Sequence, residues 1–155
     1  VPRMPNMTIR EFGCAQGILL SKLCKFYHPL HCVCNEVARY DTRDPVITQT
    51  SSMLLSSVGL ASVDLFLSSH VVEHVTPDEW FPQLGRAVKP GGFVFTEFPD
   101  QWADIPRRIV RGKYHVAFYN NPTFDAVMHR AGFDRVAVDY NRSRWIHRKR
   151  GVVAA

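Results

Sequence analysis

The apolar positions of the chain change their spacing repeatedly along its length. Short apolar runs that suit strands are followed by segments in which apolar residues recur every three or four positions, as on one face of a helix. The runs TIREFGC (8–14), HCVCNEV (31–37) and SVDLFLSS (62–69) are expected strands. The segment QGILLSKLCKFY (16–27) is an expected helix that ends before Pro29. This alternation predicts crossover connections and a largely parallel sheet.

The second half of the chain continues the same order. A helix is expected over 76–89, with Thr76 as its N-cap, Pro77 at its first position, and a kink at Pro82. The near-continuous apolar character of 62–69 suits a strand that is covered on both faces. Further strands are expected at 45–49, 91–98 and 134–140, a weak helical turn at 51–60, a helix at 121–133 and a seventh strand within 144–155. The predicted fold is α/β, a doubly wound, mostly parallel seven-stranded sheet with helices on both faces.

Length and composition favour one globular domain over 1–155. The chain has 155 residues, of which 46% are hydrophobic and 21% are charged. No apolar run approaches the ~20 residues that span a bilayer. The chain begins VPRMPNM, without an initiator methionine, so we expect its natural start and further N-terminal helices to lie upstream.

The cysteines and the charge add two expectations. Cys14, Cys24, Cys32 and Cys34 form no C-x-x-C pair, so we expect buried free thiols in a reducing, cytoplasmic compartment. The net charge of +5 is concentrated in RSRWIHRKR (142–150), which holds five Lys and Arg residues and no acid. This stretch is either a solvated strand or tail, or a surface that attracts phosphates such as those of a nucleic acid.

Candidate chemistry gathers in the loops after the expected strands, where ligands of such sheets bind. The stretch EFGCAQG (11–17) is a glycine-rich turn that opens a helix, and such a turn can point free backbone N–H groups at a ligand. Glu36 ends the second strand, where a carboxylate can accept both ribose hydroxyls. On these residues alone, a plain tight turn and a solvent-facing glutamate remain equally open.

Two further motifs decide between these readings. VDLFLSSHVVEHV (63–75) leads into the helix of 76–89, and LGRAVKPGGFVF (84–95) follows. In this order and spacing, residues 8–140 resemble the class I S-adenosylmethionine-dependent methyltransferases, in particular the group with an E-H pair after the fourth strand. The resemblance implies a Rossmann-like fold, S-adenosylmethionine as the cofactor, and methyl transfer to an O- or N-nucleophile of a small-molecule acceptor.

The resemblance also implies a cofactor site. Ala15 stands where the family often has glycine, and we expect its methyl to be tolerated through a negative φ. The family often has an adenine-binding acid after the third strand, which Gln49, Thr50 or Ser51 would replace. The implied cofactor-binding set is Glu11, Gly13, Cys14, Ala15, Gln16, Gly17, Asn35, Glu36, Thr50, Ser51, Ser68, Ser69 and His70.

The candidate catalytic residues are His70, Glu73, His74 and His115. If a helix begins at His70, the positions i, i+3 and i+4 share one face. Some relatives bind a divalent metal in this loop, so these four residues are also the candidate metal ligands. The favoured interpretation has no metal, with His74 structural and Glu73 near the cofactor pocket. A zinc peptidase is disfavoured because it needs a long helix and a distant third ligand.

The segment 98–121 is expected to cover the acceptor. Trp102 and Tyr119 are predicted to line the acceptor pocket, together with Tyr114 and His115. Three arginines in this segment are candidates for holding an anionic acceptor: Arg107, Arg108 and Arg111.

Two alternatives come from other functional classes. One is a non-catalytic scaffold or RNA-binding subunit with the same fold. The other is an NAD-dependent oxidoreductase, which is disfavoured because the loop lacks G-x-G-x-x-G. Neither the identity of the acceptor nor the oligomeric state follows from the sequence.

Overall fold

The computed structural model describes residues 1–38, 44–52, 54–98, 116–117 and 119–151. Its helices and strands follow one another along the chain. They are β1 (Thr8–Phe12), α1 (Ile18–Tyr27), β2 (His31–Asn35), β3 (Ile47–Thr50), β4 (Val63–Ser69), α2 (Pro77–Ala87), β5 (Val88–Glu97), α4 (Asn121–Arg130), β6 (Phe133–Asp139) and β7 (Arg144–Lys149). Three short 3₁₀ helices are η1 (Leu55–Ser57), η2 (Val72–His74) and η3 (Tyr140–Arg142).

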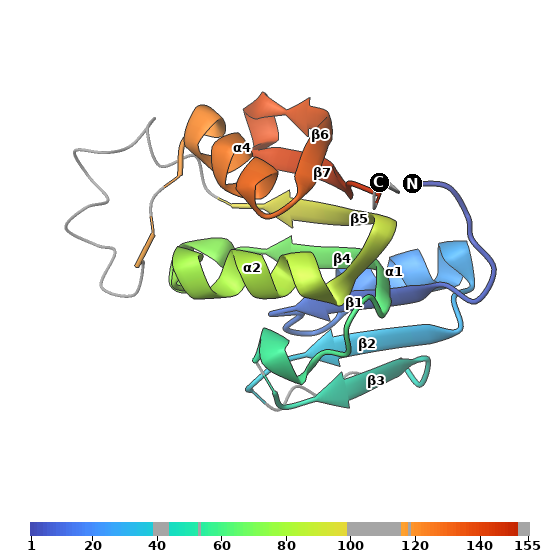
Figure 1. Cartoon of the computed structure of the whole chain (residues 1–155). Helices are drawn as coiled ribbons and strands as arrows, with labels where there is room; N and C mark the ends of the chain where they lie inside the picture. The colour runs from blue at the N-terminus through green and yellow to red at the C-terminus, as the bar shows by residue number, and fades with distance from the viewer. Residues whose placement is uncertain (39–43, 53, 99–115, 118, 152–155) are drawn as a thin grey trace.

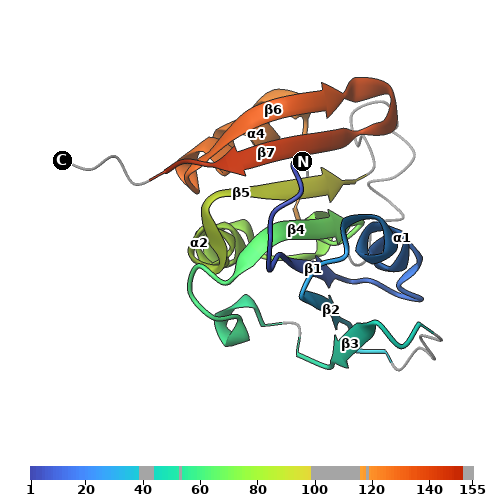
Figure 2. The ribbon, with the colours of Figure 1, turned by 90° about the vertical axis from the view of Figure 1, so that its right-hand side faces the viewer.

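The strands form one seven-stranded sheet in the order β3-β2-β1-β4-β5-β7-β6. The first five strands of this order are parallel, and β7 runs antiparallel to both β5 and β6. Helices α2 and α4 cover one face of the sheet, and α1 covers the other (Figures 1 and 2). The predicted fold class is therefore confirmed.

The sheet separates two apolar cores. On the side of α2 and α4, Phe66 of β4 packs edge to face against Trp80 of α2, and Phe98 stacks on Trp145 of β7 with ring centroids 4.3 Å apart. On the other side, Leu20 of α1 packs in one cluster with residues of β1, β2 and β4. Strand β4 is buried along nearly all its length, as its apolar run predicts.

Several boundaries differ from the prediction. Strand β5 begins at Val88 and not at Gly91, because Val88 already pairs with Val63 before the register shifts along β4. The expected turn over 51–60 is only the three-residue η1 in the described residues. Pro82 lies inside α2, as the predicted helix over 76–89 implies.

The basic stretch is neither a tail nor a freely solvated strand. It forms β7, which pairs with β5 on one side and β6 on the other. Trp145 and His147 are buried, and Arg144 pairs with Glu97 at 3.0 Å. Part of the positive charge of this stretch is thus paired within the sheet, while the side chains of Arg148 and Arg150 are exposed.

The prediction of free thiols is wrong. The structure contains two disulfides, Cys14–Cys34 and Cys24–Cys32, with Cα atoms 5.8 Å and 6.3 Å apart. Parallel pairing places Cys34 opposite Glu11, so the loop after β1 brings Cys14 back onto β2. Helix α1 likewise carries Cys24 over Cys32. Both Cα separations lie in the range of disulfides, but the spacing of the cysteines in the sequence gives no sign of this pairing.

No helix among the described residues has the length and apolar character needed to cross a membrane.

Candidate functional site

The site lies where the carboxyl ends of the central parallel strands meet. Phe12 of β1 is in register with Asn35 of β2 on one side and Ser68 of β4 on the other. The loops that follow these three strands therefore leave the sheet at the same level. Strand β1 leads to β2 on one side, and β4 lies on its other side, so this edge is the topological switch point at which ligands of such sheets bind.

The loop of residues 13–17, here called the β1 loop, is shaped by close backbone packing. Gly13 has a φ of 66°, and a Cβ added there would collide with Cγ2 of Val71. The N–H of Gly13 donates to the carbonyl oxygen of Asn35 at 2.9 Å, and that of Gly17 donates to the carbonyl oxygen of Cys14 at 2.7 Å. Helix α1 begins directly after Gly17, so its free N–H groups lie beside this loop.

Ala15 does not adopt the predicted negative φ. Its φ is 45°, in the left-handed region that a non-glycine residue enters at a cost of about 1–2 kcal/mol. Its N–H donates to Oε2 of Glu36 at 3.1 Å. The β1 loop is thus tied to the end of β2 through the very carboxylate that the sequence singled out.

Glu11 is the most perturbed acid of the site. It is 3% exposed, and its Oε2 has no hydrogen-bond partner. Burial raises the pKa of Glu11 to about 7, although a backbone hydrogen bond from Leu20 acts in the opposite direction. Ser68 at the end of β4 is also buried with an unpartnered Oγ. Buried groups of this kind suit a ligand that brings its own donors.

The two residues that end β2 have different surroundings. Glu36 accepts hydrogen bonds from the N–H groups of Ala15 and Ala38, both at 3.1 Å. Asn35 is fully buried, accepting from Nη1 of Arg10 at 2.7 Å and donating to the carbonyl oxygen of Ser52 at 2.5 Å. The side chain of Asn35 therefore holds strands together.

Arg10 is a residue that sequence reasoning missed. The available signal was a basic residue between Ile9 and Glu11 on an expected strand. Burial lowers its pKa, and its Nη1 is held by Asn35.

The candidates for adenine recognition lie at the end of β3, next to β2. Thr50 is in register with Asn35, and its carbonyl oxygen accepts from the N–H of Glu36 at 3.0 Å. Nε2 of Gln49 donates to the carbonyl oxygen of Ala38 at 3.2 Å, and Ser51 is exposed. The structure thus brings the ends of β2 and β3 together, as the sequence predicts.

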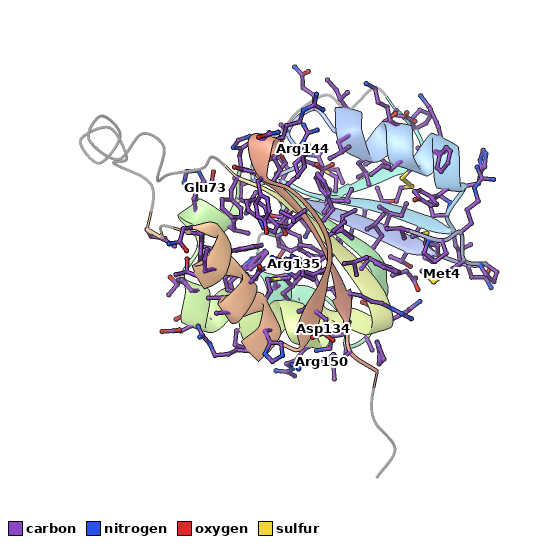
Figure 3. The ribbon with its side chains drawn as sticks, turned by 90° about the horizontal axis from the view of Figure 1, so that it is seen from above. Met4, Glu73, Asp134, Arg135, Arg144 and Arg150 are labelled. Atoms are coloured by element: carbon purple, nitrogen blue, oxygen red, sulfur yellow. A yellow bond between two sulfur atoms is a disulfide. The ribbon has the colours of Figure 1, made fainter. Side chains whose placement is uncertain are left out.

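The histidine and glutamate residues after β4 are not on one helix face. Only the three-residue η2 forms there, and His70 precedes it with a φ of 56°. Glu73 is 1% exposed, and its Oε1 lies 3.6 Å from Nδ1 of His70 and 4.0 Å from Nε2 of His74. Figure 3 shows Glu73 close to the start of α2.

No cluster that could hold a metal ion occurs among the residues that the structure describes. Several predicted residues lie outside the described part of the chain, namely Trp102, Arg107, Arg108, Arg111, Tyr114 and His115.

Comparison with known proteins identifies the family of the chain. Residues 10–96, more than half of the chain, match the family model of the methyltransferase domain. The chain belongs to the methyltransferase domain family. No curated protein sequence matches it closely.

Solved structures support the same fold at low sequence identity. An S-adenosylmethionine-dependent methyltransferase from Mesorhizobium loti is 17% identical, with a TM-score of 0.70 over 96% of this chain and 94% of that one. A protein from Galdieria sulphuraria is 14% identical, with a TM-score of 0.71 over 86% of this chain and 57% of that one. This chain therefore spans little more than half the length of that relative.

A third structure contains a product of the cofactor. It is an N-methyltransferase from Haemonchus contortus, in complex with phosphomonomethylethanolamine and S-adenosylhomocysteine. It is 14% identical, with a TM-score of 0.68 over 85% of this chain and 34% of that one. The class I methyltransferase fold of this chain is thus shown.

The residues of this methyltransferase domain fit S-adenosylmethionine. The cofactor carries an ammonium group and two ribose hydroxyls, all of which donate hydrogen bonds. The buried Glu11 carboxylate has a free oxygen, and Glu36 presents a second carboxylate at the same edge. The absence of a side chain at Gly13 leaves the β1 loop packed directly against Val71. Acceptors for the donor groups of the cofactor are therefore present at this edge, while the space beside Gly13 is taken by Val71.

Tyr119 has a different place from the one predicted. It is 4% exposed and lies in the aromatic core of the methyltransferase domain, near the rings of Phe81, Phe98 and Phe124. Burial and the charges of Asp78 and Glu73 raise its pKa well above its usual value. Its ring is thus a core element, whereas the sequence placed it on a pocket wall.

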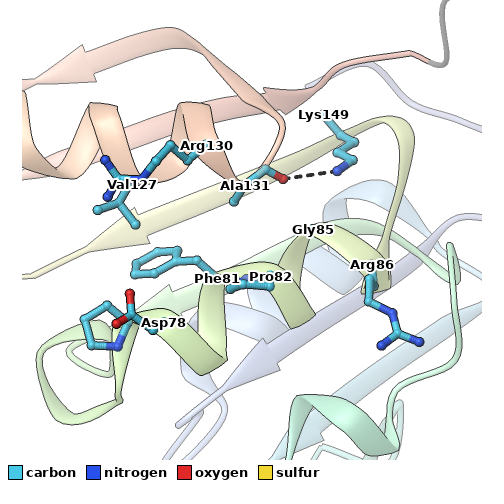
Figure 4. Close-up of a pocket in the computed structure, with 10 residues that line it drawn as sticks. Asp78, Phe81, Pro82, Gly85, Arg86, Val127, Arg130, Ala131 and Lys149 are labelled. Carbon is cyan, nitrogen blue, oxygen red and sulfur yellow. Dashed lines mark hydrogen bonds between the residues drawn. The ribbon is translucent and has the colours of Figure 1, made fainter.

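Two hollows among the described residues are lined mainly by helices rather than by the ends of the strands. One, of about 630 Å³, borders the β1 loop at Gln16 and Gly17 and continues along α1 to Lys25. The other, of about 320 Å³, lies between α2 and α4 (Figure 4). Gly85 allows these helices to approach, because a Cβ there would lie 2.6 Å from the carbonyl oxygen of Ala131.

Proposed function

We propose that this domain transfers the methyl group of S-adenosylmethionine to an oxygen or nitrogen nucleophile of a small-molecule acceptor. The observation that carries the proposal is the buried Glu11, whose free Oε2 lies at the base of the β1 loop. A buried carboxylate with one unpartnered oxygen is costly in a folded protein, and functional sites are where such groups occur.

Each residue of the edge has a role in this proposal. Glu11 accepts from the cofactor's ammonium group, Glu36 accepts from the ribose hydroxyls, and the β1 loop passes beneath both. Residues 68–70 border the methionine part of the cofactor. The cofactor, when bound, supplies an electrophilic methyl group on a sulfonium. The protein's task is then to position the acceptor in line and exclude water from it.

Proton removal from the acceptor falls to the group after β4. Glu73 lies between His70 and His74, and it is almost completely buried. A carboxylate beside an imidazole can orient the ring. We assign His70, the more exposed histidine, as the base that faces the acceptor, and Glu73 as its positioning residue.

Calorimetric titration with S-adenosylmethionine and S-adenosylhomocysteine tests the cofactor assignment. We expect both to bind, and we expect Glu11→Gln and Glu36→Gln each to weaken binding by about tenfold, as for the loss of one charged hydrogen bond. Glu79→Gln, at an exposed acid of α2, is the matched control and should bind as the wild type does. Absence of binding at millimolar cofactor would refute the proposal.

Methyl transfer is tested separately with labelled S-adenosylmethionine and a panel of small amines, alcohols and carboxylic acids. Turnover of a small acceptor supports the proposal. Cofactor binding without turnover on the panel, together with RNA binding that weakens with salt, would instead assign a nucleic-acid-binding subunit that uses exposed arginines such as Arg148 and Arg150.

We also propose a cytoplasmic location. Cytoplasmic thiols are kept reduced, and disulfides in that compartment are usually transient or redox-sensing. Alkylation of thiols in intact cells, followed by mass spectrometry of the protein, tests this proposal. Because the structure pairs all four cysteines, alkylation that changes with the redox state of the cell would agree with the proposal, whereas two disulfides that persist under reducing conditions would contradict it.

A further inference from the structure

The two disulfides connect β2 to different parts of the preceding segment. Cys14–Cys34 joins the β1 loop to the end of β2, at the cofactor edge. Cys24–Cys32 joins the body of α1 to the start of β2, away from that edge. Only the first disulfide includes a residue of the loop that would hold the cofactor.

The Cys14–Cys34 bond spans the same two segments as the loop's hydrogen bonds. Cys14 lies between Gly13 and Ala15, which both have left-handed backbones. Cys34 precedes Asn35, which accepts from Gly13, and Glu36, whose carboxylate accepts from Ala15. The disulfide therefore fixes the distance that these two hydrogen bonds must span.

The β1 loop is held in a strained conformation, and the Cys14–Cys34 cross-link keeps it from relaxing. Ala15 occupies the left-handed region, which an alanine leaves readily when nothing holds it. If the cross-link opens, the link between the β1 loop and β2 rests on the two hydrogen bonds alone. Relaxation of Ala15 would then move its N–H away from Glu36, the carboxylate assigned to the ribose.

We propose that Cys14–Cys34 is a site of reversible thiol–disulfide exchange that sets the affinity of the β1 loop for S-adenosylmethionine. This inference rests on the proposed function, since it concerns the same cofactor. The oxidised protein has the loop preorganised and binds tightly, whereas the reduced protein must order the loop on binding and binds weakly.

The exchange is balanced by two molecules of a small thiol, such as glutathione. The first, as a thiolate, attacks Sγ of Cys14, which is 6% exposed while Cys34 is fully buried. The S–S bond breaks, Cys34 leaves as a thiolate and takes up a proton, and a mixed disulfide remains on Cys14. The second thiol releases Cys14 as a free thiol and forms the external disulfide, so two electrons and two protons pass to the protein.

Linkage makes the effect reciprocal. If oxidation raises the affinity for the cofactor by a given factor, the cofactor must favour the disulfide over the dithiol by the same factor. A tenfold difference in affinity corresponds to about 30 mV in the reduction potential of a two-electron couple. The Cys24–Cys32 pair provides an internal comparison, because it lies outside the β1 loop.

The test is calorimetric titration of the full chain with S-adenosylhomocysteine, in the oxidised form and after reduction with dithiothreitol. We expect the Kd of the wild type to rise at least tenfold on reduction. The double variant Cys24→Ser/Cys32→Ser should keep this dependence. The double variant Cys14→Ser/Cys34→Ser should bind weakly, with the same Kd in both conditions.

A redox titration of the wild type gives a second readout that needs no variant. With alkylation and mass spectrometry, the potential of Cys14–Cys34 should fall by at least about 30 mV in saturating S-adenosylhomocysteine, while that of Cys24–Cys32 stays constant. An unchanged potential, or equal Kd values in the oxidised and reduced wild type, would overturn the coupling alone. Absence of binding in both states would overturn the proposed function and the coupling with it.

Discussion

A β-carbon on Gly13 would collide with Cγ2 of Val71, so the β1 loop and the loop after β4 are in contact at the cofactor edge. Val71 is buried, at 6% exposure, and Gly13 also has a φ of 66°. Two independent requirements, space and a left-handed backbone, therefore fix glycine at this position.

Gly13→Ala should lower the free energy of unfolding by about 3 kcal/mol, since it adds both a left-handed alanine and an overpacked contact. The double variant Gly13→Ala/Val71→Ala should recover about 1–2 kcal/mol relative to the sum of the single changes, because it removes the contact but not the backbone cost. Urea unfolding, followed by circular dichroism, measures the free energy of unfolding of the two single variants and of the double variant.

Gly59→Ala is the matched control for this cycle. The nearest atoms to an added Cβ there lie at 3.5 Å, an ordinary contact. Its effect should stay within about 1 kcal/mol. Strict additivity in the double variant at positions 13 and 71 would show that the two side chains do not meet.

Ala15→Gly should raise the free energy of unfolding by about 1 kcal/mol, because glycine removes the cost of a left-handed alanine at a φ of 45°. Ala61→Gly is a matched comparison at a φ of 44°, far from the cofactor edge, and should gain a similar amount. Thermal and urea unfolding of both variants provide the measurement. A loss of stability in Ala15→Gly alone would mean that its methyl group makes a stabilising contact.

Glu11→Gln should change how stability depends on pH. The carboxyl pKa is 4.5 in the unfolded chain and about 7 in the folded one. Between these values the folded protein holds more protons than the unfolded one, so wild-type stability falls as pH rises and levels off above pH 7. Between pH 4 and pH 8, the free energy of unfolding of the variant should therefore rise by about 2–3 kcal/mol relative to that of the wild type.

Urea unfolding across this pH range measures the effect, and Glu79→Gln should leave the profile unchanged. The same Glu11→Gln substitution is expected to weaken cofactor binding, so stability and function change in opposite directions. A pH profile identical to that of the wild type would show that Glu11 ionises normally.

His147→Gln should flatten the acid side of the stability profile. His147 is 1% exposed, and burial lowers its pKa, although its contact with Asp125 at 3.1 Å acts in the opposite direction. As pH falls below about 6.5, the unfolded chain takes up a proton that the folded protein resists, so wild-type stability is lost. The variant lacks this proton uptake and should lose less stability between pH 7 and pH 5.

Thermal unfolding at several pH values is sufficient for this comparison. His31→Gln, at an exposed position on β2, is the control and should follow the wild-type profile. Parallel profiles for His147→Gln and the wild type would contradict the prediction.

The order of elements and the family could be predicted from local patterns. The apolar run of β4 predicts a strand covered on both faces, and in the structure six of its seven residues are buried. Residues 11–17, 63–75 and 84–95 carry the resemblance to class I methyltransferases, and the family match confirms it. The predictions for Glu11 and Glu36 depend on their places at the ends of the first two strands, which a parallel sheet brings together, and on the resemblance to the family.

The remaining features depend on contacts between distant segments. The collision of Gly13 with Val71, the pairing of the cysteines and the burial of Tyr119 all join residues that no short pattern relates. The sequence also failed to predict the backbone of Ala15, because its φ is imposed by Gly13, Glu36 and the packing around them.

The sequence by itself determined the alternation of strands and helices, the family and the edge of the sheet at which the cofactor is expected. Those properties follow from hydrophobic periodicity and turn chemistry, which act over a few residues. Only the tertiary structure decided that Cys14 meets Cys34, that Glu11 is left with an unpartnered oxygen, and that His70 and His74 flank a buried Glu73. The reason is physical: burial and pairing are properties of the whole packed sheet, and they fix the charge and freedom of each group at the site.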